Sequence, residues 1–124
     1  MNEKILIADD EPNILVSLEY LMKREGFAVS VARDGEEALA AIVRERPALV
    51  LLDVMMPKKS GFEVCQEVRS MDAVKDTLIV MLTAKGRDTD VAKGLGLGAD
   101  AYVMKPFSTR ELVQKVRAML ERRG

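Results

Sequence analysis

The chain contains no histidine and no tryptophan, and it has a single cysteine, Cys65, among its 124 residues. Without histidine, the serine and cysteine triads that use an imidazole base are excluded, together with most transition-metal chemistry. One cysteine cannot form an internal disulfide, and no cysteine or histidine pair offers a zinc site. Because Cys65 lies one helical turn from both Phe62 and Val68, we expect it to serve packing.

The chain also lacks long apolar runs and a marked excess of either charge. No stretch approaches the roughly 20 apolar residues that cross a bilayer, and positions 1–4 lead directly into a strand pattern instead of a signal sequence. With 19 basic and 20 acidic side chains the formal charge is -1, so no general attraction to nucleic acid or an anionic membrane exists. We therefore expect a cytoplasmic protein that makes no membrane contact and no direct DNA contact.

The apolar residues, 48% of the chain, are enough for one compact domain over residues 1–124. Short apolar runs alternate with segments of helical spacing, which is typical of a doubly wound sheet. The sequence predicts an α/β sandwich in which five parallel strands alternate with five helices, with the flavodoxin-like strand order 2-1-3-4-5. The predicted strands cover 4–8, 28–32, 48–52, 78–82 and 101–104.

Three of the predicted helices begin with capping pairs, in which a side-chain oxygen and a glutamate three residues later satisfy free backbone N–H groups. These pairs are Ser60 with Glu63, Ser108 with Glu111 and, more weakly, Asp34 with Glu37. The fourth helix, about 87–97, is the poorest, because an interior glycine costs about 1 kcal/mol relative to alanine. Its glycines are Gly94, Gly96 and Gly98. A short helix stopped by glycine and an element that moves are both compatible with this pattern.

Polar residues stand where four of the apolar runs end. Asp9 and Asp10 follow the first run, Asp53 the third, Thr83 the fourth and Lys105 the fifth. In a parallel sheet these ends share one edge, and ligands bind where strands 1 and 3 meet. Crowded carboxylates at an apolar edge take up a proton or recruit a cation. Oxygen ligands favour Mg²⁺, and Mg²⁺ favours phosphate, so the sequence predicts a magnesium and phosphate site.

Taken singly, each of these residues has an ordinary explanation. A lone aspartate after a strand is more often a turn residue or a helix cap, and a lone lysine is more often a solvated surface charge. Lys58 and Lys59, which border the site, are likewise expected to be solvated. Only the joint occurrence of the polar residues on four strand ends favours a functional site.

In this combination the chain resembles, over essentially its whole length, the receiver domain of two-component response regulators. Any one matching piece is weak, but all of them in order at these strand ends make a strong signal. The pieces are Asp9-Asp10, Asp53-Val54-Met55-Met56-Pro57 with Gly61, Thr83-Ala84, and Tyr102 with Lys105-Pro106-Phe107.

The resemblance implies a phosphoacceptor and a metal site. Asp53 would accept a phosphoryl group from a phosphohistidine on a sensor histidine kinase or a histidine phosphotransfer protein. The carboxylates of Asp10 and Asp53 and the backbone carbonyl of Met55 would bind Mg²⁺, while Asp9 would act largely through a bound water. A carboxylate is a competent nucleophile toward phosphorus once its charge is neutralised and the phosphoryl oxygens are held.

The resemblance also implies a switch. Lys105 would pair with the phosphoryl oxygens, its bond to Pro106 would be cis, and Thr83 would hydrogen-bond one oxygen. Phosphorylation would draw Thr83 inward and let Tyr102 fill the space it leaves. The surface of the fourth helix, fifth strand and fifth helix would then regulate a downstream protein or effector. Such a domain is not an enzyme on other substrates, since it catalyses only its own phosphoryl transfer and dephosphorylation.

Dimer formation on phosphorylation stays open. Winged-helix transcription regulators that resemble this domain pair through a basic residue at the position of Val91 and an acidic one at that of Ala101. Both positions are apolar here, which weakens that symmetric dimer, although Lys115 and Glu111 would suit it.

Two other functions compete with this one. A Mg²⁺-dependent phosphohydrolase with an aspartyl phosphate would typically need an acid two residues beyond the nucleophile, where this chain has Met55, and a cap domain. Flavin binding would suit the sheet order, but Asp9 and Asp10 would repel the flavin phosphate.

Overall fold

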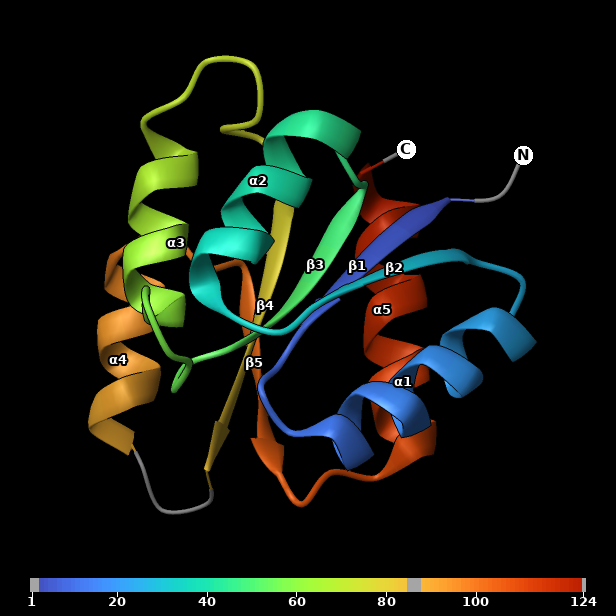
Figure 1. Ribbon diagram of the computed structural model, residues 1–124. Helices are drawn as coiled ribbons and strands as arrows, with labels where there is room; N and C mark the ends of the chain where they lie inside the picture. The colour runs from blue at the N-terminus through green and yellow to red at the C-terminus, as the bar shows by residue number, and fades with distance from the viewer. Residues whose placement is uncertain (1–2, 85–87, 124) are drawn as a thin grey trace.

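A computed structural model describes residues 3–84 and 88–123 as three layers, a parallel sheet between two layers of helices (Figure 1). The sheet has five strands in the order β2-β1-β3-β4-β5, and every neighbouring pair is parallel, which confirms the predicted topology. The strands are β1 (Lys4–Ala8), β2 (Ala28–Ala32), β3 (Leu49–Asp53), β4 (Leu78–Ala84) and β5 (Ala101–Lys105).

Three strands extend further than their apolar runs. Asp53 pairs with Leu82, Thr83 with Met104, and Ala84 with Lys105, so these polar residues belong to the ladder instead of following it. Hydrogen bonds of the ladder depend on the backbone, which continues past the last apolar side chain. The polar side chains are therefore held by the sheet itself.

The helices divide between the two faces of the sheet. On one face lie α1 (Pro12–Arg24) and α5 (Thr109–Arg123); on the other lie α2 (Gly35–Glu45), α3 (Gly61–Arg69) and α4 (Asp88–Gly96) (Figure 1). Right-handed crossovers between parallel strands place helices on both faces in this way. Within the described ranges, no helix is both long and apolar enough to span a bilayer.

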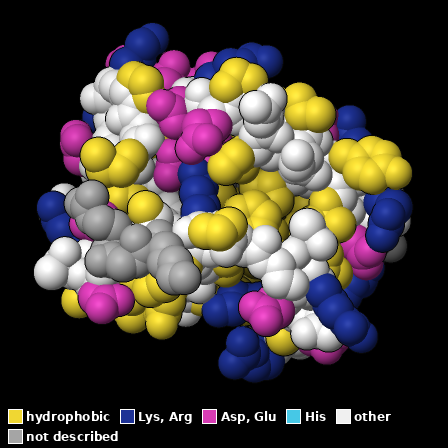
Figure 2. All heavy atoms as spheres, turned by 90° about the horizontal axis from the view of Figure 1, so that it is seen from below, with side chains coloured by type: hydrophobic (Ala, Val, Ile, Leu, Met, Phe, Trp, Pro, Cys, Tyr) yellow, Lys and Arg dark blue, Asp and Glu magenta, His cyan; other side chains and the backbone are white. Residues whose placement is uncertain are grey.

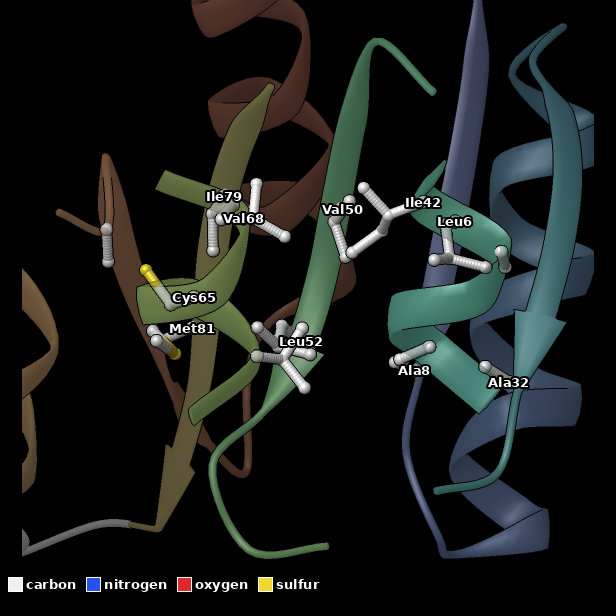
Figure 3. Close-up of a cluster of buried hydrophobic side chains, with 14 of the residues drawn as sticks. Leu6, Ala8, Ala32, Ile42, Val50, Leu52, Cys65, Val68, Ile79 and Met81 are labelled. Atoms are coloured by element: carbon white, nitrogen blue, oxygen red, sulfur yellow. The ribbon is translucent and has the colours of Figure 1, made fainter. Parts of the chain in front are cut away.

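The core alternates along each strand. In β3, Val50 and Leu52 belong to the cluster beneath α2 and α3 (Figure 3), whereas Leu49 and Leu51 pack toward α1 and α5. All four are fully buried, and each contributes about 1.5–3 kcal/mol relative to an exposed side chain. Cys65 is also fully buried in the cluster beneath α2 and α3, where burial raises the pKa of its thiol, in keeping with packing.

The helix starts follow the capping signals. Ser60 and Glu63 form a reciprocal capping box at α3. At α2 the Glu37 N–H donates to Asp34 Oδ1 at 2.8 Å. At α5 the Glu111 N–H donates to the Ser108 hydroxyl at 3.3 Å, and α1 begins with Pro12, whose fixed φ suits a first turn. Side-chain oxygens thus satisfy N–H groups that the helices themselves leave free.

The glycines of α4 have separate roles. A Cβ atom on Gly94 would lie 3.4 Å from Met81 Cγ and 3.7 Å from Phe62 Cε1, so Gly94 lets α4 approach the sheet and α3. Gly98 has a φ of +107°, the left-handed conformation that ends a helix. Residue 87, at the start of the predicted helix, lies outside the described residues. Movement of α4 remains a prediction.

Candidate functional site

The parallel register brings the polar strand ends to one edge of the sheet. Asp9 follows β1, and its N–H donates to Ala32 O at 3.1 Å. Asp53 and Lys105 are the last residues of β3 and β5, and Thr83 is the last but one of β4. Figure 2, a view from below onto this edge, shows acidic side chains gathered beside a basic one. Residues that are far apart in the sequence therefore share one small region.

Three carboxylates form the centre of this region. One oxygen from each of Asp9, Asp10 and Asp53 can be chosen so that all lie within 4.8 Å of one another. Asp9 is completely buried and Asp53 is 5% exposed, whereas Asp10 faces solvent. An all-oxygen donor set with one open side fits Mg²⁺, which keeps several waters and favours carboxylates. The three acidic residues predicted for the metal site thus fit that ion.

Lys105 supplies the positive charge within the cluster. Its Nζ atom lies 2.8 Å from Asp9 Oδ2, 3.3 Å from Asp53 Oδ1 and 3.5 Å from Glu11 Oε1. Burial alone lowers the pKa of Lys105, but the hydrogen bond to Asp9 and the charges of Asp53 and Asp9 outweigh burial, so its pKa is raised. The peptide bond between Lys105 and Pro106 is cis. The ammonium stays charged at neutral pH between two buried carboxylates.

Asp53 has a strongly raised pKa. Burial, followed by the negative charge of Asp9, raises the pKa of Asp53 to about 7 from its ordinary 3.8, while Lys105 and the Met55 N–H favour the ionised form. A carboxyl group with such a pKa ionises more readily when a cation binds beside it. Metal binding at this cluster would therefore also generate the carboxylate.

Thr83 adds a buried hydroxyl to the site. The residue is 2% exposed, and its Oγ1 atom has no hydrogen-bond partner among the residues that the structure describes. A buried hydroxyl left unpaired costs about 1–3 kcal/mol, which natural structures usually avoid. An oxygen of a group bound in the adjacent hollow would accept a hydrogen bond from this hydroxyl.

The hollow beside these residues has a volume of about 290 Å³. Its lining includes Asp10, Asp53, Met55, Thr83 and Lys105, so it brings most of the predicted site residues together. Tyr102 is 37% exposed and lines a different hollow, next to α5. The structure therefore does not bring Tyr102 into the acidic site.

Two acidic residues at the hollow were not predicted from the sequence. Glu11 donates its N–H to Asp9 Oδ1 at 3.0 Å and also reaches Lys105, and Asp90 of α4 lines the same hollow. The position of Glu11, directly after the acidic pair, was a usable signal. Asp90 had none, because only the fold brings α4 to this edge.

Lys59 of the basic pair is only partly solvated. Its Nζ atom lies 2.7 Å from Glu67 Oε2, and only 29% of its side chain is exposed. Lys58 is more exposed and lies 3.6 Å from Asp34. The turn between β3 and α3 brings Lys59 back over α3. The residues next to Lys59 in the sequence do not indicate this contact.

Residues 5–117 match the family model of the response regulator receiver domain. The chain belongs to this family. It is a family of signalling domains in which phosphorylation and Mg²⁺ are typical.

Individual relatives agree with the family match. The chain is 48% identical over 122 residues, 98% of its length, to the alkaline phosphatase synthesis transcriptional regulatory protein PhoP of Bacillus subtilis. It spans only 50% of that relative. The receiver domain of the Francisella response regulator 1452 superposes with a TM-score of 0.91 at 31% identity, covering 99% of this chain and 100% of that one. A CheY-like receiver domain protein from Methanospirillum hungatei gives the same TM-score and identity, covering 98% and 96%.

Proposed function

We propose that this receiver domain is a phosphorylation-dependent switch in which Asp53 accepts a phosphoryl group from a phosphohistidine of a sensor histidine kinase or a histidine phosphotransfer protein. The observation that carries the proposal is the meeting of three groups at one hollow. They are the Asp53 carboxylate, the Lys105 ammonium and the buried Thr83 hydroxyl, which has no partner within the described part of the chain. These are a nucleophile, a counter-charge and a donor for a phosphoryl oxygen, which is what phosphoryl transfer needs.

The metal-binding residues follow from the donor set. Asp10 and Asp53 would bind Mg²⁺ through their carboxylates and Met55 through its backbone carbonyl, with Asp9 acting through water. Bound Mg²⁺ would neutralise part of the charge on the carboxylates and on the phosphoryl oxygens. The cluster of oxygens within 4.8 Å supports this assignment.

The transfer itself uses groups of this chain. A carboxylate oxygen of Asp53 attacks phosphorus, the new O–P bond forms as the N–P bond to the donor imidazole breaks, and the imidazole leaves with the electron pair of that bond. Lys105 turns from the carboxylates toward the phosphoryl oxygens and offsets their charge. Thr83 donates its hydroxyl to one of these oxygens and so gains the hydrogen bond that it lacks in the described residues. Later hydrolysis of the acyl phosphate resets the domain.

The signal would leave through α4, β5 and α5. Thr83 moves toward the phosphoryl group, and Tyr102, now 37% exposed, turns inward into the space beside it. Lys115 of α5 donates to the Tyr102 carbonyl at 3.1 Å and lies 5.6 Å from its ring, so a turn of Tyr102 changes contacts of α5 as well. A two-state element of this kind needs arrangements that differ by only a few kcal/mol.

The output partner is a downstream protein or an effector domain. The B. subtilis relative is twice as long and is a transcriptional regulatory protein, which supports an effector of that kind without assigning DNA binding to this domain. Residues 1–124 would act as one receiver unit in the cytoplasm, where they meet the kinase. A dimer formed on phosphorylation is one form that the output can take.

Incubation with acetyl phosphate and Mg²⁺ tests the proposal. We expect stoichiometric gain of one phosphoryl group by intact mass, loss of the gain in Asp53→Asn, and no gain when EDTA replaces Mg²⁺. Asp72→Asn is the matched control, since Asp72 is fully exposed and lies 3.8 Å from Lys75, in a separate ion pair. An adduct that persists in Asp53→Asn would assign the acceptor elsewhere and refute the proposal.

A further inference from the structure

The loop 54–60, which leads from Asp53 to α3, lies directly against the first residue of α2. The Gly35 N–H donates to Pro57 O at 3.2 Å. A Cβ atom on Gly35 would overlap the Lys59 carbonyl oxygen and would lie 2.5 Å from Lys59 Cβ and 2.6 Å from its carbonyl carbon. These atoms belong to the backbone or are fixed to it, so no change of rotamer relieves the overlap. Glycine is needed here for close approach of two backbones.

Other contacts fix the same loop. The Gly61 N–H donates to Val54 O at 2.8 Å, and a Cβ atom on Gly61 would overlap the Asp53 carbonyl oxygen and lie 3.0 Å from Val54 Cα. Lys58 has a φ of +71°, an unfavourable conformation for a residue with a side chain, and its Nζ atom lies 3.6 Å from Asp34, the N-cap of α2. Strained backbone persists only where surrounding contacts determine it.

We propose that Gly35 is a positioning residue for phosphoryl transfer, which sets the path of loop 54–60 from the neighbouring helix α2 and thereby places the Met55 carbonyl beside Asp53. This inference rests on the proposed function. To relieve the overlap made by a methyl group at Gly35, the loop must shift by roughly 1 Å. This is the amount by which the distances from that methyl group to Lys59 fall short of ordinary van der Waals separation. Met55 lies in the same loop, and Mg²⁺ tolerates little departure from octahedral geometry. A displaced loop therefore weakens Mg²⁺ binding first.

Gly35→Ala, compared with Gly96→Ala, tests the inference. Gly96 is the last residue of α4, and no described residue lies within 4 Å of a Cβ atom built on it. Gly96→Ala is therefore a glycine-to-alanine change at a helix end that creates no clash there. Amide chemical shifts of residues 54–60 in the metal-free proteins report the position of the loop. Titration with MgCl₂ gives the Mg²⁺ dissociation constant, acetyl phosphate gives the phosphorylation rate, and urea unfolding gives the stability.

For Gly35→Ala we expect shifted amides in loop 54–60, a Mg²⁺ dissociation constant raised about 10-fold and, at subsaturating Mg²⁺, phosphorylation slowed by about the same factor. Saturating Mg²⁺ should recover much of the rate, which a merely structural role of Gly35 would not produce. Gly96→Ala should match the parent protein in all three measurements. A folded Gly35→Ala variant with the Mg²⁺ affinity and phosphorylation rate of the parent overturns the inference.

If Gly35→Ala alone does not fold, the change is introduced into a variant that carries Lys58→Gly and Lys59→Gly, two substitutions that make the loop backbone more flexible. The resulting triple variant is then compared with the double variant. A similar deficit in Mg²⁺ affinity supports the inference, and equal affinity overturns it. A parent protein that neither binds Mg²⁺ nor accepts a phosphoryl group overturns the proposed function together with the inference. A parent protein that does both, beside a Gly35→Ala variant that does so equally well, overturns only the inference.

Discussion

The Nζ atom of Lys105 lies 3.3 Å from Oδ1 of Asp53, and the two residues are 52 positions apart in the sequence. The same ammonium lies 2.8 Å from Asp9. Before phosphorylation, Lys105 therefore offsets the repulsion between the two buried carboxylates. If Asp53 becomes an acyl phosphate, as proposed, the same ammonium is close enough to meet the oxygens of the new phosphoryl group.

Lys105→Met should change metal binding and phosphoryl transfer in opposite directions. Loss of the ammonium leaves Asp9 and Asp53 without their nearest positive charge, so Mg²⁺ should bind more tightly, by about 1 kcal/mol. Phosphorylation by acetyl phosphate should slow by about 10²–10³-fold, because a charge that stabilises the transition state is lost. Lys93→Met, on α4 beside the Phe62 ring, is the control and should alter neither quantity. Equal rates in the two variants would remove Lys105 from the mechanism.

The raised pKa of Asp53 predicts how the metal-free protein responds to pH. Its pKa is about 7 in the folded state and 3.8 in the unfolded state. A raised folded-state pKa stabilises the protein fully below pH 4, and this stabilisation is lost as the pH rises toward 7. The loss amounts to at most about 4 kcal/mol. Asp53→Asn has no such proton to release.

Urea unfolding in EDTA at pH 5 and pH 8 measures this effect. The stability of Asp53→Asn minus that of the parent protein should be greater at pH 8 than at pH 5. Because the other titrating groups are present in both proteins, their contributions cancel in the difference. Adding Mg²⁺ at pH 8 should stabilise the parent far more than the variant. A difference that does not depend on pH would contradict the raised pKa.

Thr83→Val separates stability from function. The Thr83 hydroxyl is buried without a partner among the described residues, so its removal should raise the free energy of unfolding by about 1 kcal/mol. The phosphorylated state should at the same time lose its hydrogen bond from residue 83, and the Tyr102 response should weaken. Ser30→Ala is the opposite control, since the Ser30 hydroxyl donates to Glu45 at 2.6 Å and its loss should destabilise the protein. A destabilised Thr83→Val variant would show that the hydroxyl has a partner.

Much of this arrangement could be predicted from the sequence, because parallel strands impose a common direction on their ends. Once the apolar runs before Asp9, Asp53, Thr83 and Lys105 are assigned to one parallel sheet, their meeting at a single edge follows from the topology alone. The strand order also fixes which acidic groups are neighbours, since β1 pairs with β3. These features depend on periodicity and on a rule of the fold, both of which a sequence displays.

The contacts between elements could not be predicted in the same way. Gly35 has an ordinary helical backbone, and only the approach of loop 54–60 shows why a side chain is excluded there. Asp90 enters the site because α4 packs over β4, and Lys59 finds Glu67 because the loop turns back over α3. Each of these depends on the path of a loop in three dimensions, for which the local residue pattern carries no signal.

Arg69 is the centre of a contact network of this kind. From α3 it donates to the carbonyls of Gly98, Lys75 and Thr77 at 2.9, 2.8 and 2.7 Å, and to the Asp100 carboxylate at 2.8 Å. Arg69→Ala should lower the free energy of unfolding by about 2–4 kcal/mol, since the acceptors lose their donor and the hydrogen bonds to Gly98 and Thr77 are partly buried. Arg69→Lys should recover little of this loss, because an ammonium cannot reproduce the planar fork of the guanidinium.

The same variant should leave the chemistry at Asp53 intact. The Asp100 carboxylate also accepts the N–H of Ile79, near the start of β4, so the network lies at the edge of the sheet opposite the acidic site. Folded Arg69→Ala protein should therefore be phosphorylated by acetyl phosphate at the parent rate, within about a factor of two, while urea unfolds it at a much lower concentration. If its phosphorylation rate falls in proportion to its stability, the two edges of the sheet are coupled and the separation argued from the topology is wrong.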